Sequence, residues 1–335
     1  MRIDQWDPAD EKTTRACYEV QCAAQAADDP VAPPPSYGPF GMYLRYGYEQ
    51  EPGEAWVGRD AGGAVVGYYR ITLPDLENRD EARGGPVVHP AARRRGYGRE
   101  LLRHAGGRAA ARGRTRFSAG TTADGAGGAF AQALGARLDL EEMRRIQYLG
   151  DIAPGTIEAL RASAARAAAG YSLVSWEGPI PERYLGPMAG VLNAFNDAPH
   201  GANEEPAHWD ADRVRERTGI IVRAGLMRGH SVAAIHDSTG ELAAFSEVLI
   251  DPESPRWGRQ QLTAVLKAHR GRRLGLLVKT EMLALLAAAE PQLDRIETGN
   301  AADNSYMIAV NEQLGYRAVA PHWKFYEMPV AAALG

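Results

Sequence analysis

The chain has 335 residues, of which 45% are hydrophobic and 24% charged, and its formal net charge at pH 7 is −4. This composition is that of a globular protein, and the slight acidity argues against bulk binding of nucleic acid. The length exceeds what one ordinary core needs and suits two domains. Residues 1–5 begin no signal peptide and no apolar run has membrane-spanning length, so we expect a cytoplasmic protein without membrane or nucleic-acid partners.

The first half of the chain alternates strands with helices. Asp7 is the expected N-cap of the first helix, and a loop rich in Tyr and Gly is expected at residues 37–48. The turn at residues 60–63, Asp-Ala-Gly-Gly, predicts a hairpin between the strands on either side of it. We expect strands at the start of the chain and at 55–59, 64–73, 116–121 and 137–149, and helices at 8–27, 99–112 and 129–134.

One further strand, which ends at Val87 and Val88, is poorly specified. Gly84, Gly85 and Pro86 interrupt it, and proline has no backbone N–H to donate. We therefore expect this strand to offer few backbone donors to a ligand.

The second half repeats the plan more cleanly. Residues 151–170 are alanine-rich and join the halves, either as a connecting helix or as a mobile linker. No Gly or Pro interrupts the expected strand at 261–266, so its amides are available. We expect further strands at 171–176, 231–236, 242–250, 295–298 and 322–328, and helices at 182–194, 209–217, 274–290 and 303–314.

The two cysteines, Cys17 and Cys22, are five positions apart and would not share a helix face. We expect unreactive thiols in a protein of a reducing compartment.

Two basic glycine turns carry the clearest functional signal. Arg93-Arg94-Arg95-Gly96-Tyr97-Gly98 follows a strand and opens a helix, and Arg270-Gly271-Arg272-Arg273-Leu274-Gly275 has the same layout. Glycine permits positive φ and close backbone approach, and amides at a helix start attract anions. The repetition predicts two related domains, each with a turn for a diphosphate. Neither turn has the third glycine of the dinucleotide-binding fingerprint, which argues against an oxidoreductase.

The first turn resembles the Arg/Gln-x-x-Gly-x-Gly/Ala loop of the GCN5-related N-acetyltransferases (GNAT), which grips the pyrophosphate of coenzyme A. The second turn is similar, with Arg273 where the first glycine should stand. The order of elements around both turns is also similar to that family, so the chain resembles a tandem member, like mycothiol synthase in plan. The resemblance implies two α/β (α+β) domains, at 1–150 and 171–330 with a linker at 151–170, each a mixed, mostly antiparallel sheet flanked by helices.

The resemblance also implies acetyl-CoA as acyl donor and no metal. In the family, the strand before the loop supplies amides to the pantetheine arm and the acetyl carbonyl. Asn304 lies in a stretch that resembles the family's strand-to-helix segment. The residues expected to contact coenzyme A are Val87, Val88, Arg93, Arg94, Arg95, Gly96, Tyr97, Gly98, Arg99, Val265, Arg270, Gly271, Arg272, Arg273, Leu274, Gly275 and Asn304.

Acyl transfer to an amine requires a base, because an ammonium group has no lone pair. Glu247, inside an apolar strand, is the first candidate, since burial would raise its pKa. Strand alternation equally allows a solvent-facing Glu247. Tyr326 is the second candidate, although such a tyrosine is more often part of the core. Ala131 and Asn311 occupy the positions at which family members often carry a tyrosine. A thiolate leaves without much help, so catalysis does not require those tyrosines.

We expect the chemistry in the second half, because residues 261–266 can supply amides where Pro86 cannot. The expected function is acetyl-CoA-dependent N-acetylation of a primary amine of a small molecule, such as an amino acid derivative, aminosugar or antibiotic. Asp197 and His200, in a turn on the acceptor side, are candidate substrate contacts. A catalytically silent acyl-CoA sensor and a protein-lysine acetyltransferase remain alternatives, and the expected assembly is a monomer or a homodimer.

Overall fold

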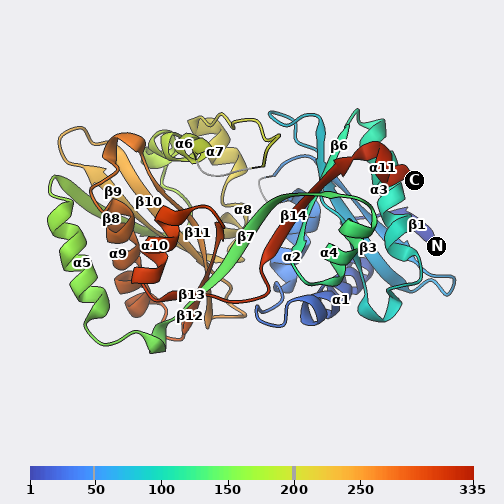
Figure 1. Ribbon diagram of the computed structural model, residues 1–335, viewed down its shortest axis with the longest axis horizontal. Coiled ribbons are helices and arrows are strands. Elements are labelled where there is room, and N and C mark those ends of the chain that lie inside the picture. The colour runs from blue at the N-terminus through green and yellow to red at the C-terminus, as the bar shows by residue number, and fades with distance from the viewer. Residues whose placement is uncertain (48–49, 198–200) are drawn as a thin grey trace. The chain divides into compact units, whose positions relative to one another are not determined.

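The computed structural model describes residues 1–47, 50–197 and 201–335, which form two compact units (Figure 1). The first unit comprises Met1–Glu142, Gly201–Glu205 and Pro321–Gly335, and the second comprises Met143–His200 and Pro206–Ala320. The chain therefore passes between the units several times. The first unit contains residues from both expected domains, 1–150 and 171–330, and the second unit contains the expected linker, 151–170.

The sheet of the first unit is mixed and mostly antiparallel. Only β4 and β6 run parallel among the pairs between its described strands. In spatial order the strands are β1 (Arg2–Gln5), β2 (Gly53–Arg59), β3 (Val65–Thr72), β4 (Glu81–Arg83), β6 (Arg116–Thr122), β14 (Trp323–Pro329) and β7 (Arg137–Tyr148), with β5 (Pro86–Val88) paired to β3.

Helices pack on this sheet as α1 (Glu11–Asp28), α2 (Tyr37–Tyr46), α3 (Tyr97–Ala111), α4 (Ala126–Ala133) and α11 (Val330–Leu334). The expected cap Asp7 is wrong: the Asp10 side chain accepts from the Thr13 N–H at 2.9 Å, so α1 begins at Glu11. The expected loop at 37–48 is also wrong as far as residue 46, because Phe40 and Leu44, one helical turn apart, are both buried. Tyr48 lies outside the described residues.

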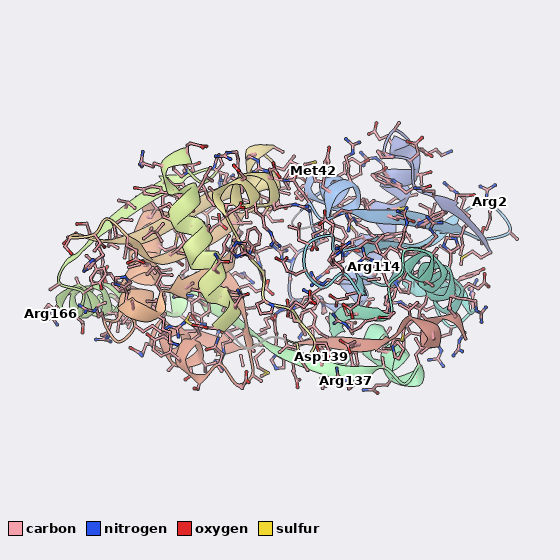
Figure 2. The ribbon with its side chains drawn as sticks, turned by 90° about the horizontal axis from the view of Figure 1, so that it is seen from above. Arg2, Met42, Arg114, Arg137, Asp139 and Arg166 are labelled. Carbon is pink, nitrogen blue, oxygen red and sulfur yellow. The ribbon has the colours of Figure 1, made fainter. Side chains whose placement is uncertain are left out.

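The last strand of the chain, β14, forms at the expected place but belongs to the first unit. It inserts between β6 and β7, antiparallel to both. Met328 joins the core of this unit, whereas Glu327 faces the other side and accepts from Arg116 at 3.0 Å and Arg137 at 3.1 Å. Arg137 also bonds Asp139 two residues along β7, and Figure 2 shows both on that strand. The alternation of β14 fits a sheet position, but a strand pattern does not say which sheet it joins.

The second unit is built on a similar sheet. In spatial order its strands are β7, β12 (Arg295–Ala301), β11 (Trp257–Val265), β10 (Leu242–Ile250), β9 (Arg228–His236) and β8 (Tyr171–Glu177), with β13 (Tyr316–Ala318) paired to β7. Strands β8 to β11 are antiparallel neighbours, and β11 runs parallel to β12. Its helices are α5 (Thr156–Ala167), α6 (Leu185–Ala194), α7 (Ala211–Arg217), α8 (Ile220–Arg223), α9 (Leu274–Ala289) and α10 (Ser305–Gln313).

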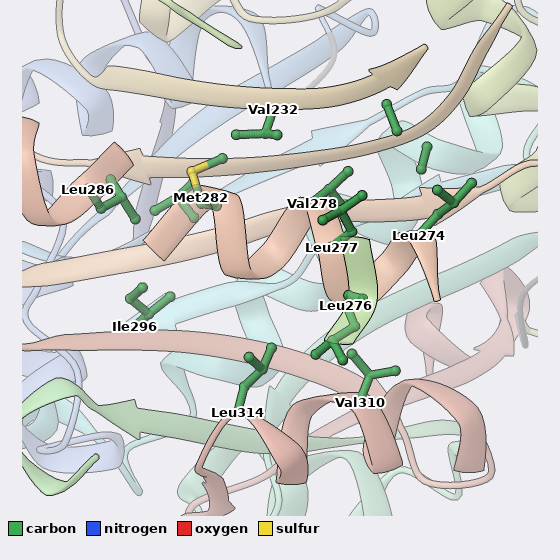
Figure 3. Packing of buried hydrophobic residues seen from close by; sticks show 14 of the residues in the cluster. Val232, Leu274, Leu276, Leu277, Val278, Met282, Leu286, Ile296, Val310 and Leu314 are labelled. Atoms are coloured by element: carbon green, nitrogen blue, oxygen red, sulfur yellow. The ribbon is translucent and has the colours of Figure 1, made fainter. Parts of the chain in front are cut away.

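Two apolar clusters hold this second sheet between helix layers. Helix α9 covers one face, where Val278, Met282 and Leu286 pack with Val232 and Ile296 (Figure 3). Burying each such side chain contributes roughly 1.5–3 kcal/mol. On the other face, α6 and α7 close a cluster that includes the β10 side chains Leu242 and Phe245. Each β10 residue therefore faces either the α9 side or the α6–α7 side.

The alanine-rich segment forms the helix α5 rather than a mobile linker. Ala164 is fully buried, Ala168 is nearly so, and both belong to the α9 core cluster. Figure 1 shows α5 beside α9. Small side chains let the two helices approach closely, which explains the alanine content.

Neither cysteine forms a disulfide. Burial raises the pKa of the Cys17 thiol to about 12, so this thiol remains protonated near neutral pH. Among the residues that the structure describes, none of the helices combines the length and apolar character needed to cross a bilayer.

The position of β14 between β6 and β7 leads to a testable prediction. A fragment of residues 1–150 should not fold, because β6 and β7 would lose the strand between them and leave Phe117 exposed. Appending residues 321–335 through a flexible linker should restore a cooperative thermal transition, measured by circular dichroism. Cooperative unfolding of the fragment without that addition would contradict the strand arrangement.

Candidate functional site

The first glycine turn has a defined backbone path from β5 to α3. Arg93 is extended, with φ −64° and ψ 162°, Arg94 is left-handed with φ 63°, and Gly96 is again left-handed with φ 87° as the N-cap of α3. The Arg93 guanidinium pairs with both carboxylate oxygens of Asp28, at 2.8 and 2.5 Å, and its Nε donates to the Val88 carbonyl at 3.2 Å. Arg93 therefore ties the turn to the end of α1, which carries Asp28.

The second turn repeats this path. Arg270 has φ −65° and ψ 160°, Gly271 has φ 82°, and Arg273 has φ 56° as the N-cap of α9. Arg270 Nε donates to the Val265 carbonyl at 3.3 Å, and the guanidinium pairs with Asp197 at 3.1 Å. The two turns thus have equivalent positions, and each contains one arginine in a left-handed conformation that favours glycine.

Arg273 adopts the backbone conformation of the glycine that it replaces. Its guanidinium donates to Ser163 Oγ on α5 at 2.6 Å and to Gln313 Oε1 on α10 at 3.2 Å. The substitution therefore preserves the shape of the turn, and the arginine side chain is anchored between two helices.

The two helix starts differ in exposure, because Gly98 is partly exposed whereas Gly275 is buried. No side chain caps α3 or α9 within the part of the chain that the structure describes. A Cβ added at Gly98 would lie 3.7 Å from Phe130, and one added at Gly275 would lie 3.6 Å from Val265, so internal packing does not require either glycine. Glycine in a helix costs roughly 1 kcal/mol relative to alanine. Room for a ligand at the helix start would account for both glycines.

The strand before the second turn leaves one edge unpaired. β11 pairs with β12 only from Trp257 to Arg259, although it continues to Val265. The Leu266 N–H donates to the Ala243 carbonyl on β10 at 2.9 Å. Because successive N–H groups alternate in direction, those of Val265 and Thr263 point away from β10. The strand thus offers donors along the side from which β12 has diverged.

In the first unit, the strand before the turn also separates from its parallel neighbour, but it offers one backbone N–H donor fewer. β4 pairs with β6 over Glu81–Arg83, and the His89 N–H donates to the Val66 carbonyl on β3 at 3.0 Å. Val88 therefore matches Val265, and Pro86 matches Thr263. The missing N–H of Pro86 removes a donor that the second unit retains.

Glu247 lies on β10 and faces the α6–α7 side. It is in register with Ser231 on β9, which is in register with Trp176 on β8, so the three side chains form a row across the sheet. Ser231 Oγ and Trp176 Nε1 are buried without a hydrogen-bond partner among the described residues. Burial raises the pKa of the Glu247 carboxyl to about 7, although this side chain is only partly shielded from solvent. A carboxyl with this pKa can take up a proton at neutral pH.

Comparison with known proteins indicates which family this fold and site resemble. Residues 18–135 match the acetyltransferase (GNAT) family model. A tandem GNAT protein from the clavulanic acid biosynthesis pathway is 29% identical, with a TM-score of 0.81 and 98% of each chain covered. The whole chain resembles a tandem GNAT protein. A GCN5-related N-acetyltransferase from Sphaerobacter thermophilus has the same fold at 15% identity, with a TM-score of 0.67 over 98% of this chain and 95% of the other.

The family and the expected fold class are therefore confirmed. GNAT proteins are N-acyltransferases, and both units of this chain have the mixed sheet flanked by helices. Within the described ranges, no group of three or more His, Cys, Asp or Glu side chains is placed to hold a metal ion.

The two catalytic candidates belong to different compact units. Tyr326 lies on β14 in the first unit, buried in register with Ala119 of β6, whereas Glu247 lies on β10 in the second. Tyr326 was expected to serve the second half because it follows that half in the sequence. Its strand, β14, belongs to the first unit instead. His200 lies outside the described residues, and Asp197 is the partner of Arg270.

The other predicted contacts divide into exposed and structural positions. Asn304 caps α10 by accepting from the Met307 N–H at 3.2 Å, and Leu274 is buried in the core. Val87 packs on the cluster beneath α1, and Arg272 lies 5.8 Å from the ring centroid of Tyr171. The remaining predicted residues of the first turn are exposed or partly exposed; these are Arg94, Arg95, Tyr97 and Arg99.

The sequence pattern does not single out a buried polar group beneath β11. Lys279 of α9 donates to Gln260 Oε1 at 3.2 Å, and Gln260 Nε2 donates to Ser246 Oγ at 3.1 Å. A lysine among the apolar residues of 274–289 was the available signal. It is weak, because a helix usually turns a lysine outward.

The shared path of the turns predicts a stability change. Arg94 is exposed and left-handed, so Arg94→Gly should raise the unfolding free energy by about 1 kcal/mol. Arg95, its exposed neighbour, has no positive φ, and Arg95→Gly should give no such gain. Urea unfolding followed by circular dichroism would measure both variants. Equal effects in the two would contradict the conformation assigned to Arg94.

Proposed function

We propose that this tandem GNAT protein transfers the acetyl group of acetyl-CoA to a primary amine of a small molecule, and that the second unit carries out the transfer. The observation that carries the proposal is a contrast at equivalent positions. Ser246 pairs with Thr263 in the second unit as Tyr69 pairs with Pro86 in the first, so Glu247 is equivalent to Arg70.

Arg70 cannot serve as a base. It is buried, and it donates to the carbonyls of Leu44 at 3.3 Å and Glu51 at 3.2 Å. The first unit thus lacks both the carboxyl and the second strand donor. We assign it diphosphate binding through Gly96 and Gly98, without chemistry.

Acetyl-CoA, when bound, supplies an activated thioester. The start of α9 near Gly275 would hold its diphosphate, and the Val265 and Thr263 N–H groups would donate to the pantetheine arm and the acetyl carbonyl. Backbone N–H groups held on a strand can stabilise the negative charge that develops on that oxygen during attack. The Glu247 carboxylate accepts the proton of the attacking amine, directly or through a water at the unpartnered Ser231 and Trp176 atoms.

Two observations support a small-molecule acceptor. The similar tandem GNAT protein belongs to a biosynthetic pathway for a small molecule, clavulanic acid. Glu247 is also only partly exposed and lies in register with Ser231, which is fully buried. A panel of amino acid derivatives, aminosugars and aminoglycosides, with a lysine peptide as the protein-type arm, would test this by following thiol release. Binding of acetyl-CoA without turnover of any amine would favour a silent sensor instead.

Glu247→Gln should lower kcat by about a hundredfold or more, because glutamine keeps the shape and loses the base. The dissociation constant of acetyl-CoA should change little.

The raised pKa of Glu247 means that wild-type kcat/KM falls as the pH drops through about 7, when the carboxyl takes up a proton. Glu247→Gln should lack this acidic limb in a pH–rate profile, and an unchanged limb in that variant would exclude Glu247 as the base.

Aspartate in either turn should show which unit is catalytic. Gly275→Asp places a negative charge at the start of α9 and should reduce acetylation at least about tenfold. Gly98→Asp makes the same change at α3 and should affect the rate less. Steady-state kinetics with one good acceptor measures both. If Gly98→Asp abolishes turnover while Gly275→Asp leaves it intact, the first unit is the enzyme.

A further inference from the structure

A buried lysine of the second unit has no role in the function proposed above. Lys279 is 3% exposed, and its Nζ lies 3.2 Å from Gln260 Oε1 and 4.9 Å from the ring centroid of Tyr316. Within residues 1–47, 50–197 and 201–335, no carboxylate pairs with this ammonium. Glu297 of β12 is bonded to Arg144 at 2.8 Å and to Trp257 at 3.0 Å. Burying an unpaired ammonium is costly, so its presence calls for a functional reason.

The fold itself does not require a lysine here. α3 and α9 begin at equivalent residues, so Leu102 of α3 is equivalent to Lys279, and Leu102 is buried in the core of the first unit. An apolar side chain therefore satisfies this position in the same architecture. The lysine occurs in the unit that has the strand donors and Glu247.

Lys279 is also placed where the two parallel strands part. Gln260, its partner, is the residue after Arg259, the last β11 residue paired to β12. Gly275 precedes Lys279 by one helical turn, on the same stripe of α9. From Gln260 the hydrogen bonds continue to Ser246 Oγ and on to Thr263 Oγ1, each at 3.1 Å, along the strand that bears the free N–H groups.

We propose that Lys279 is the general acid that serves the departing sulfur of the acyl donor in the second unit; this rests on the proposed function. As the amine nitrogen bonds to the acyl carbon, the carbon–sulfur bond breaks and its electron pair goes to sulfur. The Lys279 ammonium gives that sulfur a proton, the amine proton passes to Glu247, and solvent reprotonates the lysine after the products leave.

The chemistry of the group suits this role. Burial lowers the pKa of Lys279 to about 7, which makes the ammonium a better proton donor than an exposed lysine. A thiol has a pKa near ~8.5, so transfer from this ammonium to a thiolate is favourable.

The test compares binding of coenzyme A with binding of desulfo-coenzyme A, which lacks the sulfur. All proteins carry Gly98→Asp, so that the remaining site is in the second unit, and calorimetry at pH 7.5 gives the affinities. The parent should bind coenzyme A about tenfold more tightly than the desulfo compound. Lys279→Met should reduce this preference to within about twofold while desulfo-coenzyme A binds as before.

The control removes a positive charge elsewhere near α9. Arg161 of α5 pairs with Glu281 of α9 at 2.5 Å, and Arg161→Met should keep the full preference for coenzyme A. Lys279→Met should also melt at a higher temperature, since it replaces a buried polar group with an apolar one of similar length. If it does not fold, Lys279→Leu, which copies Leu102, replaces it.

An undiminished preference for coenzyme A in a folded Lys279 variant would overturn the assignment of Lys279 and leave the proposed function standing. Failure of the Gly98→Asp parent to bind either compound would overturn the proposed function, and the assignment with it.

Discussion

The architecture of this protein depends on how two parallel strands part. Over their first residues β11 and β12 satisfy one another's backbone groups, and beyond Arg259 they do not. Thr263 and Val265 at the edge that opens are only partly buried, so their N–H groups are available to a ligand with acceptors. The basic turn follows this edge directly, and α9 begins after the turn. In the proposed function, the strand donors and the start of α9 bind one extended anionic molecule.

The two units use this plan differently, and the differences lie at equivalent residues. Pro86 withholds the N–H that Thr263 keeps. Arg70 occupies the place of Glu247 as a buried cation bonded to backbone carbonyls. Such paired differences are what is expected when one copy keeps a binding role and the other performs chemistry. In both copies the turn is preserved even where glycine and arginine change places, because the left-handed conformation can be carried by either residue at a cost of about 1 kcal/mol.

Local signals made much of the fold predictable. Neighbouring residues determine the turns, the hairpin at residues 60–63 and the apolar helix 274–289. These elements formed close to the expected bounds. Helix α2 was missed because Tyr and Gly have low helix propensity, and burial of Phe40 and Leu44 decided its structure instead. The place of β14 was unpredictable, since a strand pattern fixes its faces and not its neighbours. The burial of Lys279 depends on tertiary packing that the sequence does not reveal.

The central claim is that the unpaired edge of β11 and the start of α9 bind the acyl donor. Hydrogen–deuterium exchange, with and without acetyl-CoA, measures it directly at the amides involved. The account predicts slower exchange at Thr263 and Val265 and in the first turn of α9 when acetyl-CoA is present. Slower exchange confined to the turn at residues 93–98, with 263–276 unchanged, would contradict it.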